Sequence, residues 1–192
     1  VAVWSWTASG RSLESLGLNA GTAAGWQVGV AWGIAIAVMG QQLVQLRMID
    51  RNDETRLQLK DMLFSSGDYD QVMPRRRKDV WAFQLVAVTA GITEEVVFRG
   101  FLIGVFAMFM PVWPAAGLAL AVFVLAHAYQ GWKGMLRILP ISVILTLVFV
   151  LSGSLWPGIL LHIFVDILGG HIAWKLLPKE GYLQIDDAQP IG

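Results

Sequence analysis

The sequence lacks cysteine altogether, and its charged residues are scarce. Without a thiol, disulfide bonds, thiolate nucleophiles and cysteine-based zinc sites are excluded. Asp, Glu, Lys and Arg make up 15% of the 192 residues, whereas soluble domains carry about 25%. Acidic and basic side chains balance to a net charge of zero, so the charge gives no reason to expect binding to nucleic acid.

Apolar residues, in contrast, are abundant, at 56% of the sequence with nine tryptophans. A single soluble core of this size cannot bury so much apolar surface, so lipid must solvate part of it. The chain begins at Val1, and no basic segment precedes a short apolar core, so we expect no signal peptide. We predict an all-α, polytopic integral membrane protein.

Five apolar stretches have the character of membrane-spanning helices, and we predict about five spans. They are residues 22–46, 80–110, 113–130, 136–151 and 156–177. At about 1.5 Å per residue the second is longer than a bilayer core, so we expect it to tilt, to extend into the cytosol or to kink near Gly100. The fourth is short, which favours a turn at 152–157 that dips into the protein.

The segments outside the core are polar or extramembrane. We predict an extramembrane segment at 1–21, a cytoplasmic loop at 47–79, a catalytic core at 80–177 and a polar tail at 178–192. Within the loop, Asp53–Phe64 has the composition of a helix that lies on the membrane surface.

The basic residues indicate the orientation. Arg and Lys gather in the loop 47–79 and near residues 133–137 and 175–179, whereas the short loops on the other side hold none. This asymmetry places the basic side in the cytoplasm. The run RRRK at 75–78 lies beside a span, so we expect it to contact anionic lipid rather than nucleic acid.

Few ionisable residues remain inside the predicted spans. They are Glu94, Glu95, Arg99, His127, His162, Asp166 and His171. An ionised group at membrane depth costs on the order of 2.5 kcal/mol or more, so such residues are usually paired and functional. We interpret His171, near the inner interface, as structural. Serine chemistry is not predicted, because no GxSxG motif occurs.

The spacing of the neighbouring glutamates Glu94 and Glu95 relative to Arg99 predicts different roles for them. Glu95 and Arg99 stand four residues apart in the order that favours a helical ion pair, while Glu94 points to a neighbouring face. We predict that Arg99 holds Glu95 and that Glu94 is left as a general base. For Glu95, a structural ion pair and a direct catalytic role both stay open. Gly100 and Gly104 have the spacing of a close helix contact.

The histidines also have partners at helical spacing. His127 shares a helix face with Phe123, whose ring is most simply packing, and His162 shares one with Asp166. A single buried histidine is more often structural, but two near a free glutamate indicate function. His162 lies close to the outer end of its span. It therefore reaches Glu94 only if the turn before this span dips into the protein or the helices tilt strongly.

Three motifs thus follow one another, each within an apolar span: EExxxR at 94–99, FxxxH at 123–127 and HxxxD at 162–166. In order and spacing they resemble the signature of the CAAX protease and bacteriocin-processing (CPBP) family, intramembrane glutamic proteases that include Abi proteins and type II CAAX prenyl endopeptidases. The resemblance covers residues 80–177, about half of the chain.

The resemblance implies a role for each matched residue. Glu94 matches the glutamate that, with His127, activates a water for attack on the peptide carbonyl. Arg99 matches the arginine that positions the glutamate pair, and His162 the histidine that stabilises the oxyanion. Asp166 stands where the CAAX enzymes have Asn, although family members with Asp exist.

The Asp in this position changes the expected chemistry. Asn can donate a hydrogen bond to an oxyanion, whereas ionised Asp only accepts and would repel it. Asp166 could instead orient His162 or be protonated. The predicted site therefore has Glu94, His127, His162 and Asp166 as catalytic residues, with Glu95, Arg99 and Phe123 in support.

No cofactor is predicted. Glu94, His127 and His162 have the side-chain types of a catalytic zinc site, but no HExxH motif occurs, so zinc is the less favoured alternative.

The sequence therefore predicts an intramembrane peptidase that cuts a membrane-embedded or membrane-proximal peptide. We expect it in a bacterial cytoplasmic membrane, where a leader peptide or small membrane protein is a better substrate than a prenylated CAAX tail. The alternative is a non-catalytic member acting as an immunity, scaffold or accessory subunit of a membrane protein complex. A transporter with a proton relay is less favoured, because no inverted repeat is visible.

Overall fold

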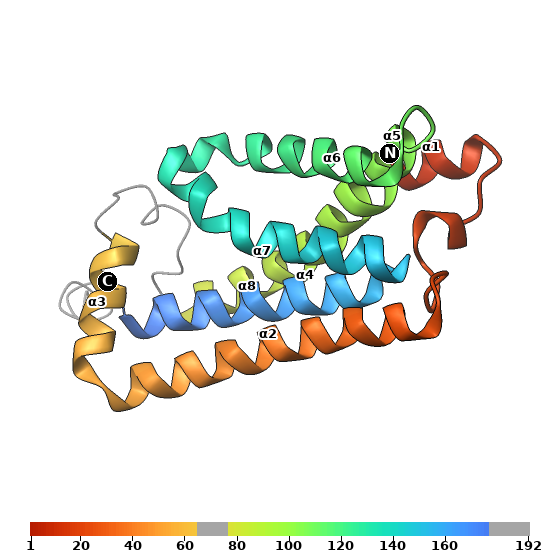
Figure 1. Cartoon of the computed structure of the whole chain (residues 1–192). Helices are drawn as coiled ribbons and strands as arrows, with labels where there is room; N and C mark the ends of the chain where they lie inside the picture. Colours follow the sequence, from red (N-terminus) through yellow and green to blue (C-terminus); the bar gives the residue numbers. More distant parts are fainter. Residues whose placement is uncertain (65–76, 177–192) are drawn as a thin grey trace.

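A computed structural model describes residues 1–64 and 77–176 of the chain. Both described ranges are helical and contain no strand, which confirms the predicted all-α fold. The predicted tail at 178–192 and the beginning of the basic run, at 75–76, lie outside the described residues. In Figure 1, α2, α7 and α8 run alongside one another, and α6 lies over α7.

The helices follow one another with short connections. In chain order they are α1 (Ala2–Ala8), the 3-10 turn η1 (Glu14–Leu16), α2 (Gly25–Arg51), α3 (Asp53–Phe64), α4 (Arg77–Glu94), the π-helix η3 (Glu95–Leu102), α5 (Ile103–Phe106), α6 (Val112–Ala126), the 3-10 turn η4 (Ala128–Gln130), α7 (Gly131–Ser152) and α8 (Trp156–Leu176).

A helix occupies each of the five predicted spans. Within residues 1–64 and 77–176, three helical stretches are long and apolar enough to cross a membrane: Gly25–Arg51, Ala128–Ser152 and Trp156–Leu176. The apolar helix α6 is shorter, and the second predicted span is divided among α4, η3 and α5. The number of crossings, five, therefore stays a prediction.

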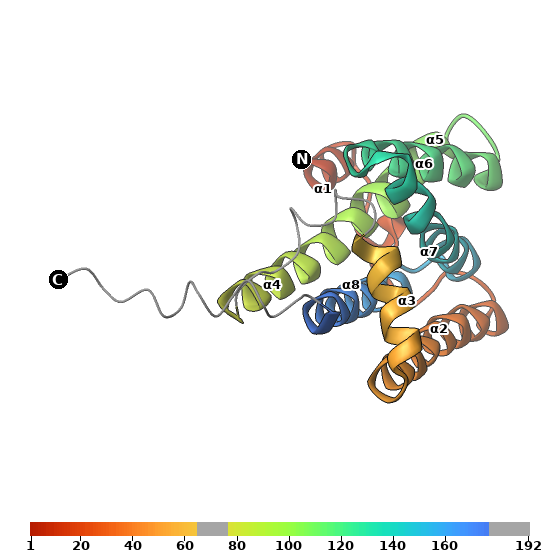
Figure 2. The same cartoon turned by 90° about the vertical axis from the view of Figure 1, so that its left-hand side faces the viewer.

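The second predicted span changes its winding near Gly100, from α-helix to π-helix. α4 continues directly into the eight-residue π-helix η3, which α5 then follows. Figure 2 shows α4 inclined across the bundle beside α8. π-helical segments are rare and frequently mark functional sites, and this one begins at Glu95 and contains Arg99.

The fourth predicted span is longer than the sequence indicated. α7 has 22 residues and begins at Gly131, before the predicted start at 136. The prediction began too late because it relied on apolar character, and the first turns of this helix carry the charged residues Lys133 and Arg137. The premise that this span is too short for a crossing was therefore wrong.

The turn between α7 and α8 is nevertheless buried, as predicted, although its depth in a membrane stays a prediction. Ser152, Ser154 and Leu155 are each 1% exposed or less. The N-terminal segment closes over them, because the Leu155 N–H donates to the Gly17 carbonyl (2.8 Å) and the Thr22 N–H to the Ser152 carbonyl (3.1 Å).

The same N-terminal segment, predicted to lie outside the membrane, packs on the π-helix. A Cβ added at Gly100 would lie 2.6 Å from the Leu16 carbonyl oxygen, and one at Gly104 would lie 2.6 Å from the Trp6 ring. The close contact predicted for these glycines is thus confirmed, but its partner is the N-terminal segment rather than a spanning helix.

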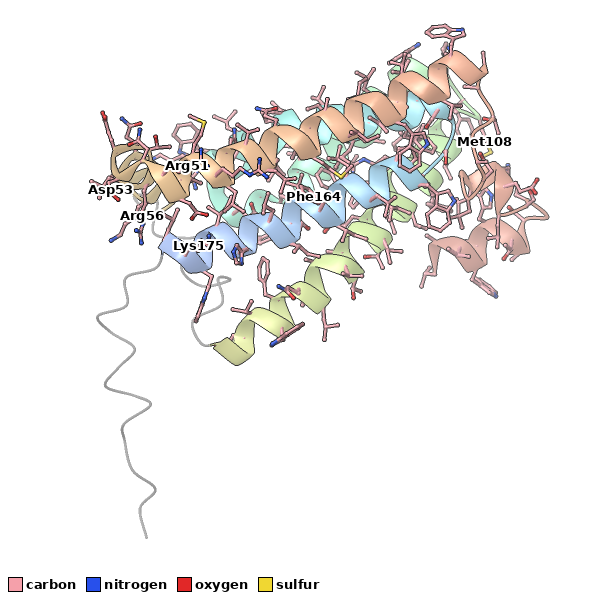
Figure 3. All side chains as sticks on the ribbon, turned by 90° about the horizontal axis from the view of Figure 1, so that it is seen from below. Arg51, Asp53, Arg56, Met108, Phe164 and Lys175 are labelled. Carbon is pink, nitrogen blue, oxygen red and sulfur yellow. The ribbon has the colours of Figure 1, made fainter. Side chains whose placement is uncertain are left out.

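The predicted helix at Asp53–Phe64 is present as α3, with the expected bounds. Its position on the membrane surface stays a prediction. Its Leu59 packs against Ile49 of α2 and the end of α8. Figure 3 shows Arg51, Arg56 and Lys175 at the same end of the bundle, opposite the end that carries Met108. This clustering agrees with the basic residues lying on one side of a membrane.

Candidate active site

A chain of buried charged groups joins the π-helix to α8. Glu95 and Arg99 are 0% and 1% exposed. Arg99 Nη1 lies 3.0 Å from Glu95 Oε1, a close ion pair without hydrogen-bond alignment. The same Oε1 lies 2.9 Å from His162 Nδ1. Since an ionised carboxylate only accepts, we assign the proton to Nδ1. Glu95 thus holds the ring and turns Nε2 away from itself.

The second ring nitrogen of His162, Nε2, lies near two further carboxylates. His162 Nε2 lies 3.8 Å from Glu94 Oε2 and 3.6 Å from Asp166 Oδ2. These side chains are 28% and 35% exposed, in contrast to the fully buried Glu95. Glu94 therefore keeps an accessible carboxylate, while Arg99 pairs with Glu95 as the spacing predicts.

The guanidinium of Arg99 is enclosed by groups from three helices. Its Cζ lies 4.3 Å from the centre of the Phe123 ring, and its Nη2 donates to the Ser142 carbonyl at 3.4 Å. A cation over an aromatic face is attracted by the ring quadrupole. Phe123, expected to be simple packing, therefore also contacts the charge that holds Glu95.

His127 stands at the end of α6 beside the same ring. Its Nδ1 lies 2.9 Å from the Phe123 carbonyl oxygen, and its ring centre lies 4.5 Å from that of Phe123. Because a carbonyl only accepts, Nδ1 donates and Nε2 keeps its lone pair. Among the described residues, no hydrogen bond or ion pair joins His127 directly to Glu94 or His162.

Glycine brings α8 close enough to the acidic pair. A Cβ added at Gly158 would lie 3.0 Å from Glu95 Oε2, and one at Gly91 would lie 2.6 Å from Ile163. Together with the buried turn before α8, this close approach lets His162 meet Glu94 and Glu95 despite its position early in the helix. Glu95 Oε2, beside Gly158, has no hydrogen-bond partner among the described residues.

Sequence reasoning did not find three parts of the site. The Glu95–His162 contact joins residues 67 positions apart, and the Ser142 contact uses a backbone carbonyl, so neither leaves a local signal. Gly158 did leave one, because it stands four residues before His162 and so shares its helix face.

Metal binding finds no support in this arrangement. Within the described residues, no group of three His, Cys, Asp or Glu side chains is placed to hold a metal ion. Glu94, His127 and His162, the alternative zinc ligands, form no such group, and zinc stays an untested alternative.

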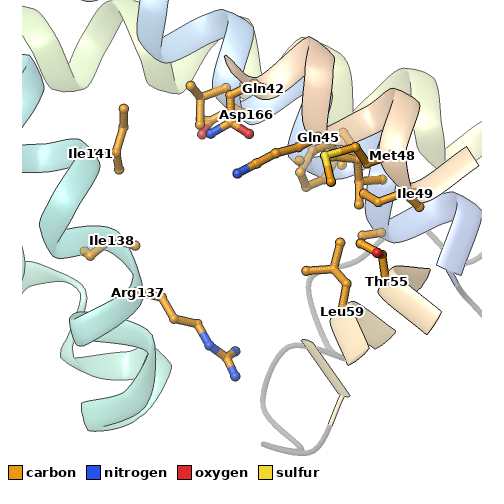
Figure 4. Close-up of a pocket in the computed structure, with 16 residues that line it drawn as sticks. Gln42, Gln45, Met48, Ile49, Thr55, Leu59, Arg137, Ile138, Ile141 and Asp166 are labelled. Carbon is orange, nitrogen blue, oxygen red and sulfur yellow. The ribbon is translucent and has the colours of Figure 1, made fainter. Parts of the chain in front are cut away.

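A cavity of about 630 Å³ lies beside the charged cluster, and Asp166 is the member of the cluster that lines it (Figure 4). α2, α3, α4, α7 and α8 all contribute to its wall. The lining residues are Gln42, Gln45, Met48, Ile49, Thr55, Leu59, Phe83, Arg137, Ile138, Ile141, Val165, Asp166, Gly169, Gly170, Ile172 and Ala173.

Comparison with known proteins gave a match to a family model. Residues 76–168 match the family model described as type II CAAX prenyl endopeptidase Rce1-like. Comparison with curated proteins and with solved structures gave no match. The matched region contains all three motifs. Among the described residues, three helices are long and apolar enough to cross a membrane. The protein is an integral membrane protein, and its residues 76–168 are similar to the Rce1-like family of type II CAAX prenyl endopeptidases.

Proposed function

We propose that the protein is an intramembrane endopeptidase that hydrolyses a peptide bond in a membrane-proximal substrate. One observation carries this proposal: the accessible carboxylate of Glu94 faces His162 Nε2 at 3.8 Å, while Glu95 fixes the opposite nitrogen at 2.9 Å. A base and a proton donor thereby lie beside each other, where both could reach the same peptide carbonyl. The match to a family of endopeptidases supports the same activity.

In the proposed mechanism, Glu94 takes a proton from water as the oxygen attacks the peptide carbonyl. His127 Nε2 accepts a hydrogen bond from the same water and orients it. His162, protonated on both nitrogens, donates from Nδ1 to Glu95 and from Nε2 to the developing oxyanion. Glu94 then returns its proton to the leaving nitrogen, and the carbon–nitrogen bond breaks to give an acid and an amine.

Asp166 fits this scheme as the group that stabilises the charge on His162. Its Oδ2 lies on the Nε2 side of the ring, at 3.6 Å, and not on the Nδ1 side that Glu95 occupies. An ionised Asp166 would therefore favour the doubly protonated ring of His162. That ring donates a hydrogen bond to the oxyanion, which an ionised carboxylate cannot do. Asn is then not required at this position.

We further propose a bacterial cytoplasmic membrane as the location, and a leader peptide or small membrane protein as the substrate. Zinc has no role in the proposed mechanism. A membrane protein complex that contains the enzyme is compatible with this function.

The test compares membranes from cells that carry either the wild type or Glu94→Gln. This change keeps the size of the side chain but removes the proton acceptor. We expect protein N-termini, mapped by mass spectrometry, that are produced with the wild type and lost with the variant. Glu54→Gln, at an exposed position of α3, is the matched control and should keep them.

The same experiment separates the rival function, a non-catalytic subunit of a membrane complex. The Asp at position 166 favours that rival, because the CAAX enzymes have Asn there. If Glu94→Gln supports the cellular role of the protein and leaves every N-terminus unchanged, the peptidase proposal is wrong.

A further inference from the structure

The cavity beside the active site has a wall that the family region does not supply. Gln42 and Gln45 come from α2, and Thr55 and Leu59 from α3, whereas the family match begins at residue 76. The opposite wall comes from α7 and α8. Its α7 residues and Asp166 lie within that match, whereas the lining residues at 169–173 of α8 follow it. Whatever the cavity binds is therefore selected partly by helices that precede the catalytic domain.

The cavity adjoins the catalytic groups at Asp166. This residue lines the cavity and also lies 3.6 Å from His162 Nε2. Gln42 of α2 and Asp166 of α8 are both part of the lining (Figure 4). A molecule that fills the cavity can therefore contact Asp166, beside His162, and the Gln42 amide.

The lining combines an apolar surface with a few polar groups. Seven of the sixteen lining residues are isoleucine, leucine, methionine or valine, and Gln42 and Gln45 stand three residues apart on α2. An amide side chain both donates and accepts, so this pair can match the N–H and C=O groups of an extended peptide. A lipid tail would leave the same amides without partners, which is costly in an apolar site.

The size of the cavity suits a short stretch of peptide. About 630 Å³ lies within the range of about 300–1,000 Å³ of pockets that hold organic ligands. Asp166, the acidic residue of the lining, would repel acidic side chains placed beside it.

We propose that this cavity binds an uncharged, mainly apolar stretch of the substrate next to the bond that is cut, and that α2 and α3 thereby determine specificity. The proposal rests on the proposed peptidase function. Its occupant is a peptide, with the Gln42 and Gln45 amides on its backbone and the apolar wall on its side chains.

The first test measures binding without hydrolysis, in full-length Glu94→Gln protein in lipid vesicles. The probe is an acyl-anchored peptide of alternating leucine and alanine that carries an environment-sensitive fluorophore. Leu59→Trp fills the cavity and should weaken binding by about tenfold, as the loss of room in an apolar pocket does. Leu57→Trp, on the same helix but 65% exposed, should change binding by less than about twofold.

The second test addresses the amides and does not depend on the bulky variant folding. Gln42→Leu should weaken binding of the probe, whereas Gln41→Leu, at the exposed neighbouring position that is not in the lining, should not. A probe with aspartate in place of the alanines should bind more weakly than the original probe to the Glu94→Gln protein without further changes.

Three results would overturn the proposal: equal effects of the Leu59 and Leu57 variants, equal effects of the Gln42 and Gln41 variants, or equal binding of a probe that keeps the acyl chain and lacks the peptide. The last result would identify a lipid cavity. Because binding is measured in the Glu94→Gln protein, it succeeds or fails separately from hydrolysis. A wild type that binds the probe in the expected pattern but cuts no peptide would contradict the proposed function alone.

Discussion

The charge of Arg99 is enclosed by partners from three different helices. Glu95 balances it, the Phe123 ring covers it and the Ser142 carbonyl accepts a hydrogen bond from it. A buried ion pair contributes little over an apolar pair of the same shape, but removing one partner leaves an uncompensated charge. Arg99 therefore determines whether Glu95 can be present as a buried carboxylate that holds His162.

Arg99→Gln should accordingly destabilise the protein by about 3–5 kcal/mol, because it leaves the Glu95 charge buried and unpaired. The free energy of unfolding, measured by denaturant titration in detergent micelles, checks this. Arg56→Gln, at an exposed position of α3, should change it by less than about 0.5 kcal/mol.

A double variant decides between charge and shape as the cause. Arg99→Gln combined with Glu95→Gln removes both charges and should be more stable than Arg99→Gln alone, since neighbouring partners are not additive. If the double variant is less stable than the single one, the lost stability comes from packing around Arg99 and the charge argument is wrong.

At the scale of single elements, local spacing predicted what lies on one helix and missed what lies between helices. The Glu95–Arg99 pair follows from four-residue spacing, which survives the change from α- to π-helix. The winding itself has no sequence signal, and the contact with His162 depends on how α8 packs against η3. For the same reason the cavity wall formed by α2 and α3 could not be predicted, because no motif connects those helices to the site.

The N-terminal segment shows how a sequence without any motif can still support the site. Leu16 is fully buried, and it packs with Leu155, Ile159 and Val96 in one apolar cluster. Leu155 precedes α8 and Val96 follows Glu95, so the cluster joins the starts of the two elements that meet at His162.

We therefore expect Leu16→Ala to cost about 2–5 kcal/mol of stability, the usual range for a buried leucine reduced to alanine. Leu13→Ala, three residues earlier and 44% exposed, provides the control and should have little effect. Thermal unfolding followed by circular dichroism distinguishes the two. Equal melting temperatures for both variants would mean that the segment does not brace the turn.

At the scale of the whole molecule, the distribution of charge argues for one orientation. Arg51, Arg56 and Lys175 lie at one end of the bundle, and Lys175 Nζ pairs with Asp50 across α8 and α2 at 2.8 Å. At the other end, the turn from α7 to α8 and the segment that covers it contain few basic residues. Positive charge near span ends is retained in the cytoplasm, so the end with α3 should be cytoplasmic.

The absence of cysteine makes this orientation directly testable, since any introduced cysteine is unique in the chain. Ser9→Cys and Arg56→Cys place a thiol at exposed positions near opposite ends. A membrane-impermeant maleimide should label Ser9→Cys in intact cells, and Arg56→Cys only after permeabilisation. α2 is the one predicted span between these two positions. Labelling of both from the same side would therefore mean that α2 does not cross the bilayer, and this would contradict the five-span arrangement. The same result would place the cavity. Because α3 contributes Thr55 and Leu59 to its wall, a cytoplasmic α3 would put the cavity in the cytoplasmic half of the membrane.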